Sequence, residues 1–209
     1  MADVLRDGGI EEPFEVQTKT IPGALEGRDV CCRAPTGSGK TLAFGIPLVT
    51  MSPKAEPKRP TSLILTPTRE LAEQIRGVLK PLADSIGLRI ASVYGGTPYK
   101  GQYRRLNKGV EILVACPGRL IDLLERGALR LDDVGIVVLD EADRMADMGF
   151  MQPVCSILDK CKKDRQTILF SATLDEEVSE IVDSYQDDPL TVCLLYTSPS
   201  PRDQRGARL

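Results

Sequence analysis

A glycine-rich loop at residues 34–41 (APTGSGKT) has the composition of a phosphate-binding site. Its glycines allow the backbone to curl so that successive N–H groups face inward, where they can bind phosphate oxygens. Lys40 can reach the outer phosphates of a nucleoside triphosphate, and the Thr41 hydroxyl can ligate Mg²⁺. The general pattern begins with glycine, whereas alanine stands first here. The predicted nucleotide-binding residues of the loop are Thr36, Gly37, Ser38, Gly39, Lys40 and Thr41.

Hydrolysis of a nucleotide also needs acidic groups, and residues 140–143 (DEAD) supply them directly after an apolar run. One carboxylate must hold Mg²⁺, and another must orient or deprotonate the attacking water. Asp140 suits the metal, directly or through its waters, and Glu141 suits the water. The sequence therefore predicts Lys40, Asp140 and Glu141 as catalytic residues, with Thr41 and Asp140 holding the metal.

Short apolar runs alternate with helical segments along the chain. The predicted strands are residues 29–33, 62–65, 89–94, 111–115, 135–139 and 167–170. Their continuous apolar character is typical of parallel strands covered on both faces. Helical spacing occurs in residues 69–83, 119–126 and 175–186, and another helix is expected from the glycine-rich loop to Val49. This order predicts an α/β fold with a doubly wound, mainly parallel sheet flanked by helices.

The two motifs are expected to meet in space. Ligands of such sheets bind beyond the carboxyl ends of the strands, and each motif directly follows a strand. We therefore expect Lys40 and Asp140 to lie at one edge of the sheet around a shared magnesium nucleotide. A turn that only caps a helix is the alternative interpretation of residues 34–41, but the strand before the loop and the helix after it favour a phosphate site.

The composition is that of one soluble globular domain. The 209 residues are 42% hydrophobic and 27% charged, and no apolar run reaches the length of a membrane span, so no membrane partner is expected. The N-terminus lacks the apolar core of a signal peptide, which favours the cytoplasm. A net charge of −3 and 4% aromatic residues argue against a broadly electrostatic nucleic-acid binder and a base-stacking platform. The six cysteines, in a chain without histidine, are expected to be buried free thiols.

Two segments have no core-facing pattern. Residues 52–60 (SPKAEPKRP) are rich in proline and lysine and are expected to form an exposed loop. Residues 195–209 (LYTSPSPRDQRGARL) resemble the translated read-through of a cloning adapter and are expected to be a non-native or disordered tail. The predicted domain therefore comprises residues 1–194.

Further motifs follow the predicted strands in a recognisable order. They are residues 67–71 (PTREL), 95–96 (GG), 117–119 (PGR) and 171–173 (SAT), with residues 9–17 (GIEEPFEVQ) near the N-terminus. Together with the glycine-rich loop and the DEAD tetrapeptide, they resemble the first RecA-like domain of DEAD-box RNA helicases over residues 1–194. The resemblance implies a RecA-like P-loop NTPase fold and an ATP hydrolase that unwinds RNA duplexes locally, with ATP and Mg²⁺ as cofactors.

The resemblance also implies roles for individual residues. Gln17 would recognise adenine through its side-chain amide, whose adjacent donor and acceptor complement the N6/N7 edge of that base. The residues expected to contact the backbone of single-stranded RNA are Thr68, Arg69, Gly95, Gly96, Gly118 and Arg119. The residues expected to couple hydrolysis to strand separation are Asp143, Ser171 and Thr173.

Some of these residues also have purely structural interpretations. Gln17, taken alone, would be an ordinary helix residue. Arg69 could form an ion pair with Glu73, which follows at helical spacing. Thr173 could cap the helix that starts near Asp175.

The sequence departs from the family pattern in three respects. Cys116 stands where the family usually has threonine, and a thiol is a weaker hydrogen-bond partner than a hydroxyl, so a weaker phosphate contact is expected there. The upstream aromatic residue that stacks on adenine has no counterpart, and neither has the second RecA-like domain with its arginine fingers, so a truncated chain is expected. We therefore expect weak binding of ATP·Mg²⁺, very slow hydrolysis and no unwinding.

Two alternative functions remain at this point. One is an ATP-switched RNA-binding module without turnover, although the intact Lys40, Asp140 and Glu141 argue against lost chemistry. The other is a DNA translocase of a neighbouring helicase branch, which Gln17 and Asp143 disfavour.

Overall fold

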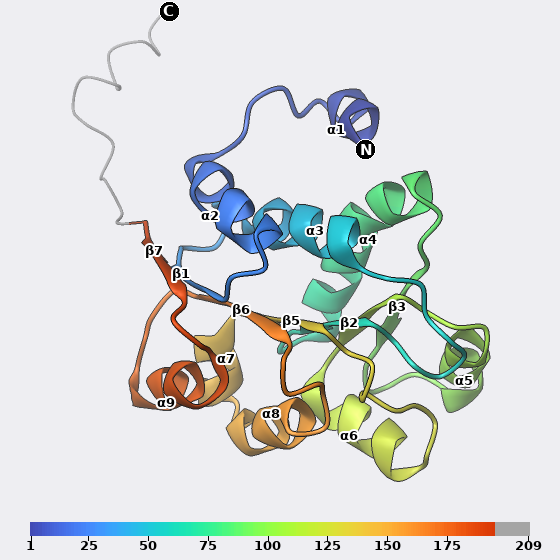
Figure 1. Cartoon of the computed structure of the whole chain (residues 1–209). Coiled ribbons are helices and arrows are strands. Elements are labelled where there is room, and N and C mark those ends of the chain that lie inside the picture. Colours follow the sequence, from blue (N-terminus) through green and yellow to red (C-terminus); the bar gives the residue numbers. More distant parts are fainter. Residues whose placement is uncertain (195–209) are drawn as a thin grey trace, which may run out of the picture.

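The computed structural model describes residues 1–194, which form one sheet of parallel strands between two layers of helices (Figure 1). The strand order across the sheet is β3-β4-β2-β5-β6-β1-β7, and all neighbouring pairs are parallel. The strands are β1 (Val30–Arg33), β2 (Ser62–Leu65), β3 (Ile90–Val93), β4 (Ile112–Ala115), β5 (Ile136–Asp140), β6 (Gln166–Ser171) and β7 (Leu190–Cys193). The predicted doubly wound α/β fold is confirmed.

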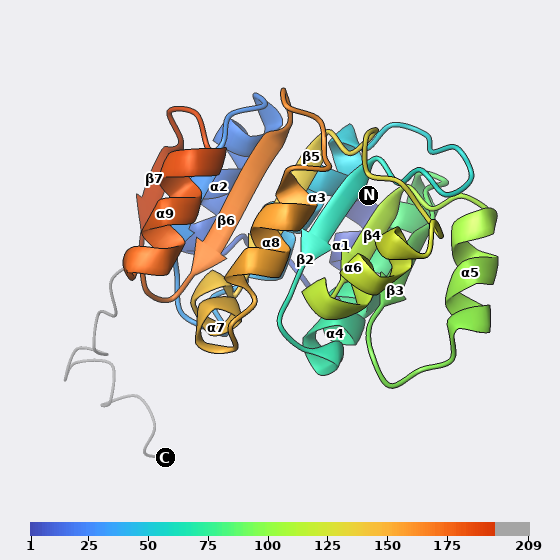
Figure 2. The ribbon, with the colours of Figure 1, turned by 90° about the horizontal axis from the view of Figure 1, so that it is seen from below.

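Helices cover both faces of this sheet. The helices are α1 (Ala2–Asp7), α2 (Glu15–Leu25), α3 (Lys40–Met51), α4 (Arg69–Ser85), α5 (Tyr99–Asn107), α6 (Pro117–Glu125), α7 (Ala142–Asp147), α8 (Met151–Leu158) and α9 (Glu176–Tyr185). Helices α2, α3 and α4 lie on one face and α6 to α9 on the other, while α5 lies at the outer edge beside β3 (Figures 1 and 2). The core therefore has two halves, one on each side of the sheet.

The central strands are buried along their whole length, as their continuous apolar runs predict. Every residue of β2, β4 and β5 is buried, as expected for parallel strands with helices on both faces. The six predicted strands and the four predicted helices are found within two residues of their expected ends. Helix α6 begins earlier than predicted because Pro117 occupies its first turn, where the missing proline N–H removes no helical hydrogen bond. Residues 52–60 contain no helix or extended strand, as predicted.

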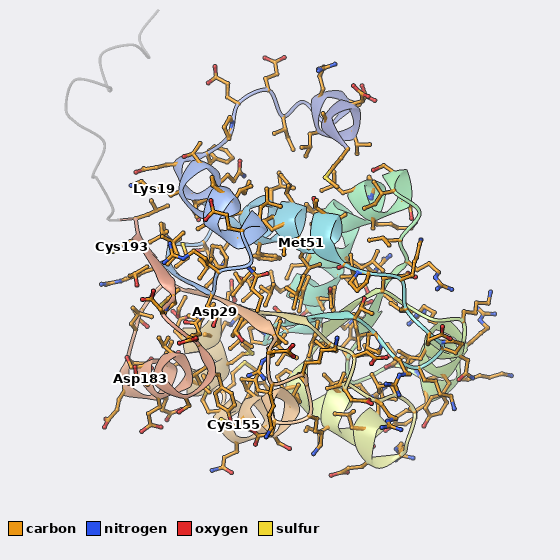
Figure 3. The ribbon with its side chains drawn as sticks, in the orientation of Figure 1. Lys19, Asp29, Met51, Cys155, Asp183 and Cys193 are labelled. Carbon is orange, nitrogen blue, oxygen red and sulfur yellow. The ribbon has the colours of Figure 1, made fainter. Side chains whose placement is uncertain are left out.

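Strand β7 was not predicted, and a buried carboxylate helps to explain its position. Asp29, labelled in Figure 3, accepts hydrogen bonds from the backbone N–H groups of Thr167 (2.7 Å) and Asp187 (2.8 Å). Its carbonyl oxygen accepts a third from Leu190 at 2.7 Å. Burial raises the pKa of Asp29, and the backbone hydrogen bonds oppose that rise. These contacts join the amino end of β1 to β6 and to the segment that leads into β7.

All six cysteines carry free thiols. Cys31, Cys32 and Cys161 are buried, as expected, and burial raises the pKa of the Cys32 and Cys161 thiols to about 12. Cys193 is exposed on β7, so the expectation of burial is wrong for this residue (Figure 3).

The structure leaves one sequence prediction outside its range. Residues 195–209, for which a non-native or disordered tail was expected, lie outside the described residues. Within residues 1–194, no helix combines the length and apolar character needed to cross a membrane.

We predict that Phe44→Ala strongly destabilises the domain. Phe44 is fully buried on α3, and its ring packs edge-on against Phe170 of β6 with centroids 5.5 Å apart. Truncating a buried phenylalanine to alanine costs about 3–5 kcal/mol because it leaves a cavity. Urea unfolding followed by circular dichroism measures the loss. Phe14→Ala is the matched control, since Phe14 is 61% exposed, and equal losses in the two variants would contradict the packing described here.

Candidate functional site

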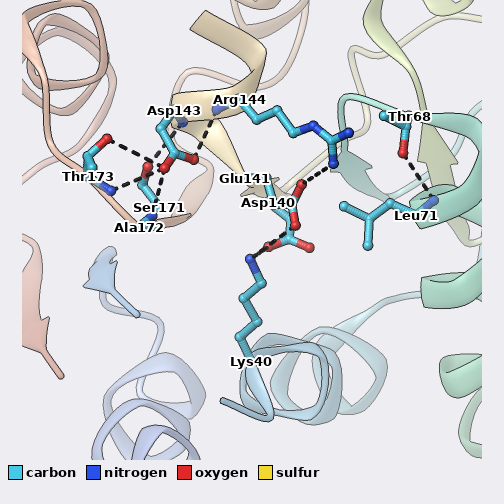
Figure 4. Close-up of polar contacts among 10 residues, drawn as sticks. All are labelled: Lys40, Thr68, Leu71, Asp140, Glu141, Asp143, Arg144, Ser171, Ala172 and Thr173. Carbon is cyan, nitrogen blue, oxygen red and sulfur yellow. Dashed lines mark hydrogen bonds and ion pairs between the residues drawn. The ribbon is translucent and has the colours of Figure 1, made fainter. Parts of the chain in front are cut away.

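Lys40 and Asp140 lie beside one another at the carboxyl edge of the sheet (Figure 4). Lys40 is the first residue of α3, and Asp140 is the last residue of β5. The Lys40 Nζ atom is 3.0 Å from Oδ1 of Asp140 and 3.8 Å from Oε1 of Glu141. Strand β6 separates β1 from β5 in the sheet, so residues about a hundred positions apart are brought together by the order of the strands. The predicted convergence is confirmed.

This ion pair is almost completely shielded from water. Asp140 is fully buried and Lys40 is 7% exposed. Burial raises the pKa of Asp140, and the positive charge of Lys40 opposes that rise. Apart from the Lys40 ammonium at 3.0 Å from Oδ1, no described side chain supplies a hydrogen bond to the carboxylate oxygens. Oδ2 of Asp140 is thus left without a protein partner, and Oδ1 is held by the Lys40 ammonium.

A buried carboxylate with an unpartnered oxygen fits a magnesium site. Mg²⁺ is usually held by one or two carboxylates, several waters and phosphate oxygens rather than by a cage of protein ligands. Among the described residues, no cluster of three or more acidic, cysteine or histidine side chains could bind a metal by itself. Asp140 and the Thr41 hydroxyl therefore cannot form a complete metal site by themselves. They fit the predicted metal-holding pair when the phosphate oxygens of a nucleotide supply further ligands.

The glycine-rich loop has the backbone that phosphate binding requires. Gly37 and Gly39 have φ angles of 82° and 84°, which L-residues with side chains rarely adopt. A Cβ atom on Gly39 would lie 2.4 Å from a ring carbon of Phe14 and 2.8 Å from Nε2 of Gln17. The loop is attached to β6 at its start, because the Ala34 N–H donates to the Ser171 carbonyl at 2.9 Å. The curled backbone and the open surface at Gly37 fit a phosphate group.

Gln17 connects α2 to the glycine-rich loop. Its Oε1 accepts from the Phe14 N–H and its Nε2 donates to the Gly39 carbonyl, both at 3.0 Å. Gln17 is therefore more than an ordinary helix residue, since it positions the loop. A primary amide has two N–H groups and two oxygen lone pairs, so one donor and one acceptor remain for a base. Adenine recognition by Gln17 stays a prediction.

Glu141 has an unusual backbone conformation that sequence reasoning missed. Its φ and ψ angles are 55° and 53°, the left-handed region, which costs a non-glycine residue on the order of 1 kcal/mol. Strain of this kind is concentrated at functional sites. The Glu141 carboxylate also accepts a hydrogen bond from Arg144 at 3.3 Å. The position of Arg144 three residues later on α7 was the only signal in the sequence for this contact.

The predicted coupling residues are in direct contact (Figure 4). Oδ2 of Asp143 accepts from the backbone N–H groups of Ala172 (3.1 Å) and Thr173 (3.2 Å), and its own N–H donates to the Ser171 hydroxyl at 3.0 Å. The expected pairing of Asp143 with residues 171–173 is confirmed. The alternative role for Thr173 as a helix cap is wrong, because Asp175 caps α9 with its own side chain.

The predicted RNA-contacting residues also gather at the carboxyl edge. Thr68 and Arg69 follow β2, residues 95–96 follow β3, and residues 118–119 follow β4. These three strands are neighbours in the order β3-β4-β2. Arg69, Gly95, Gly96 and Gly118 are exposed to solvent. The structure therefore presents these loops side by side, and their contact with RNA stays a prediction.

The structure corrects the alternative proposed for Arg69. Glu73 forms its ion pair with Arg76 at 2.7 Å, and the Arg69 guanidinium instead lies 5.3 Å from the centre of the Tyr94 ring. The predicted Arg69–Glu73 ion pair is therefore wrong. Thr68 has a structural role in addition to its predicted one, because its hydroxyl caps α4 by accepting from a first-turn N–H at 3.3 Å.

Arg119 and Cys116 at the start of α6 differ from expectation. The Arg119 side chain is only 9% exposed; it packs on the Tyr99 ring at 4.3 Å and donates to the Thr97 carbonyl at 3.0 Å. Its guanidinium thus ties α6 to the loop that follows Gly96, and RNA contact by Arg119 stays a prediction. The Cys116 thiol makes no capping hydrogen bond, and burial raises its pKa to about 11, so it stays protonated at neutral pH.

We predict that Lys40→Met destabilises the chain at neutral pH by about 3–5 kcal/mol, because it leaves a buried carboxylate without a counter-charge. The pKa of Asp140 is already raised by burial, and loss of the cation raises it further. The folded variant then binds a proton more tightly than the unfolded chain does. The loss of stability in Lys40→Met should therefore be largest above the pKa of Asp140 in the folded variant. It should shrink as the pH falls through that pKa.

Urea unfolding at neutral and mildly acidic pH measures this effect in Lys40→Met, Asp140→Asn and the double variant. Since the double variant contains no buried charge at this position, it should be more stable than Lys40→Met alone at neutral pH. Additive losses at every pH would show that the two side chains do not interact as described.

Comparisons with known proteins identify the family. Residues 14–181 match the family described as DEAD/DEAH box helicase. RNA helicase CrhR of Synechocystis sp. is 44% identical over 199 residues, which cover 95% of this chain and 40% of that protein. ATP-dependent RNA helicase DBP2 of Eremothecium gossypii is 45% identical over 192 residues, which cover 90% of this chain and 34% of that protein.

Solved structures show the same fold. The RNA helicase Prp28 of Chaetomium thermophilum, bound to ADP, superposes with a TM-score of 0.86 at 40% identity, covering 94% of this chain and 48% of that one. A DEAD box protein of Methanococcus jannaschii gives 0.85 at 38% identity, covering 91% and 52%. The chain spans 31% to 40% of the length of the first four curated relatives. Because the family match includes most of its residues, this chain belongs to the DEAD/DEAH box helicase family.

Proposed function

We propose that this chain is the first RecA-like domain of an ATP-dependent RNA helicase. The observation that carries the proposal is the meeting of Lys40, Asp140 and Glu141 beside a phosphate-binding loop at the carboxyl edge of the sheet. Its ligands would be ATP with Mg²⁺ and the sugar-phosphate backbone of single-stranded RNA. RNA rather than DNA is supported by the names of the relatives, which are RNA helicases. A cytoplasmic location remains part of the proposal.

The residues of the nucleotide site would act through charge and position. The N–H groups of residues 36–41 and the start of α3 bind phosphate oxygens, helped by the positive end of the helix dipole. The Lys40 ammonium contacts Asp140 in this structure, and with nucleotide bound it would also contact the outer phosphates. Asp140 and Thr41 would hold Mg²⁺, which would supply positive charge to neutralise the phosphates.

Glu141 would act on the attacking water. Its carboxylate lies 3.8 Å from the Lys40 ammonium, at the edge where the outer phosphate is expected. There it can accept a hydrogen bond from the water and orient it, or take its proton. Asp143 lies two residues further on, and its contacts with residues 171–173 give a direct mechanical link from the hydrolytic residues to the β6–α9 loop.

Efficient turnover would require a second domain. Arginine fingers contribute on the order of 10³–10⁵ in rate in related nucleotide hydrolases, and in this family the second RecA-like domain supplies them. We therefore propose that the 209-residue chain binds ATP·Mg²⁺ weakly, hydrolyses it very slowly and does not unwind RNA by itself.

Gln17→Ala should reduce the affinity for ATP by about two- to tenfold, the effect of one or two lost hydrogen bonds, and should abolish any preference for ATP over GTP. Competition of ATP and GTP against a fluorescent nucleotide measures both effects. Gln74→Ala is the matched control, since Gln74 is an exposed glutamine on α4. Equal affinities of the unaltered chain for ATP and GTP would refute base recognition by Gln17.

In a protein that joins this chain to a second RecA-like domain, Glu141→Gln should slow single-turnover ATP hydrolysis by about 10²–10⁴-fold while leaving ATP binding nearly unchanged, because an amide cannot accept the proton of the water. Asp147→Asn, an exposed position on the same helix, serves as control. An unchanged rate in Glu141→Gln would favour the ATP-switched module without turnover. Robust RNA-stimulated hydrolysis by the unaltered chain would contradict the need for a second domain.

A further inference from the structure

Helix α5 carries a stripe of basic side chains that the site described above does not use. Residues 94–110 contain four cations and no acidic residue, although the whole chain has a net charge of −3. Lys100, Arg104 and Lys108 follow one another at intervals of four residues, which places them along one face of the helix. All three are exposed. Within residues 1–194, none of these three side chains forms an ion pair or donates a hydrogen bond.

The basic stripe is continuous with the loops predicted to contact RNA. Helix α5 starts three residues after Gly96 and lies at the outer edge of the sheet beside β3 (Figures 1 and 2). Its first residue, Tyr99, donates a hydrogen bond to Asp122 of α6 and lies under the Arg119 guanidinium. The start of α5 is therefore fixed to the start of α6, and the stripe extends away from both. From Lys100 to Lys108 it spans about 12 Å at 1.5 Å per residue.

The surface around α5 is hollowed on both sides. An open hollow of about 580 Å³ is lined by Lys100, Tyr103, Arg104, Asn107 and Lys108. A second, of about 280 Å³, lies between α4, β3 and α5 and includes Arg76, Tyr94 and Arg105. The carboxylate in that second hollow, Glu73, is already paired with Arg76. Basic side chains and one tyrosine therefore line each hollow.

Protection of the sheet edge explains only part of this charge. Charged side chains beside an edge strand prevent it from pairing with other chains, and Arg105 does bond to the edge, donating to the Ser92 carbonyl at 3.4 Å. Lys100, Arg104 and Lys108 make no such bond. Like charges four residues apart also disfavour a helix, so the stripe does not serve the local stability of α5. Neither edge protection nor helix stability accounts for these three cations, whereas binding of a polyanionic ligand would.

We propose that α5 extends the RNA-binding surface, with Lys100, Arg104 and Lys108 binding the phosphates of a strand that continues beyond residues 95–96 and 118–119. The proposal rests on the proposed function, since it takes RNA as the ligand of the neighbouring loops. Contacts of this kind carry no base specificity, because phosphates are the same in every nucleotide. They do require a strand long enough to reach the stripe, so the contribution of α5 depends on RNA length.

The test compares two oligouridylates of about 6 and about 16 nucleotides, a range typical of single-strand-binding domains. Binding to the whole chain is followed by fluorescence anisotropy at several salt concentrations. The variant Lys100→Gln/Arg104→Gln/Lys108→Gln should lose on the order of tenfold in affinity for the long RNA, and its salt slope should fall by about 2, since each lost phosphate contact removes about 0.7. Affinity for the short RNA should change little.

The control variant is Lys160→Gln/Lys162→Gln/Lys163→Gln. It removes the same charge from exposed positions between α8 and β6, at the amino edge of the sheet.

Equal losses in the two variants would reduce the effect to net charge and overturn the proposal, as would an unchanged affinity of the α5 variant for the long RNA. If the α5 variant lost binding to an acidic peptide but kept its affinity for RNA, α5 would be assigned to a protein partner instead. If the unaltered chain bound neither RNA, the proposed function itself would fail.

Discussion

A carboxylate buried at the end of a central strand needs a positive charge nearby, and in this chain Lys40 supplies it. Asp140 is fully buried, its pKa is raised by desolvation, and its one compensating charge lies 3.0 Å away on another element. Burial of one member without the other would be strongly unfavourable. The start of α3, the glycine-rich loop and the end of β5 are therefore held in one arrangement.

The order of the strands then divides the carboxyl edge into two regions. Strands β1, β6 and β5 lie together and carry the glycine-rich loop, residues 171–173 and the acidic tetrapeptide. Strands β2, β4 and β3 lie together and carry the loops predicted to contact RNA. Because β5 pairs with β2, the nucleotide region and the RNA region share a boundary in the middle of the sheet. Two functions can be served by one edge because each occupies a separate set of adjacent strands.

Polar contacts join neighbouring elements within each region. Asp143 accepts backbone hydrogen bonds from the β6–α9 loop, and Gln17 joins α2 to the glycine-rich loop. On the RNA side, Arg119 packs between α6 and the segment before α5. The left-handed backbone of Glu141 adds conformational strain beside Lys40.

The sequence by itself determined the strands, the parallel sheet, the glycine-rich loop and the meeting of Lys40 with Asp140. These follow from continuous apolar runs and from motifs that directly follow strands, which are local patterns. The partners of long polar side chains were decided only by the tertiary structure: Arg69 stacks on Tyr94, Arg119 turns inward, and Asp175 rather than Thr173 caps α9. Strand β7 is short and has one buried residue, so its pattern is too weak to recognise. A flexible charged side chain has several acceptable partners of similar energy within reach, and which one it contacts depends on how distant segments pack.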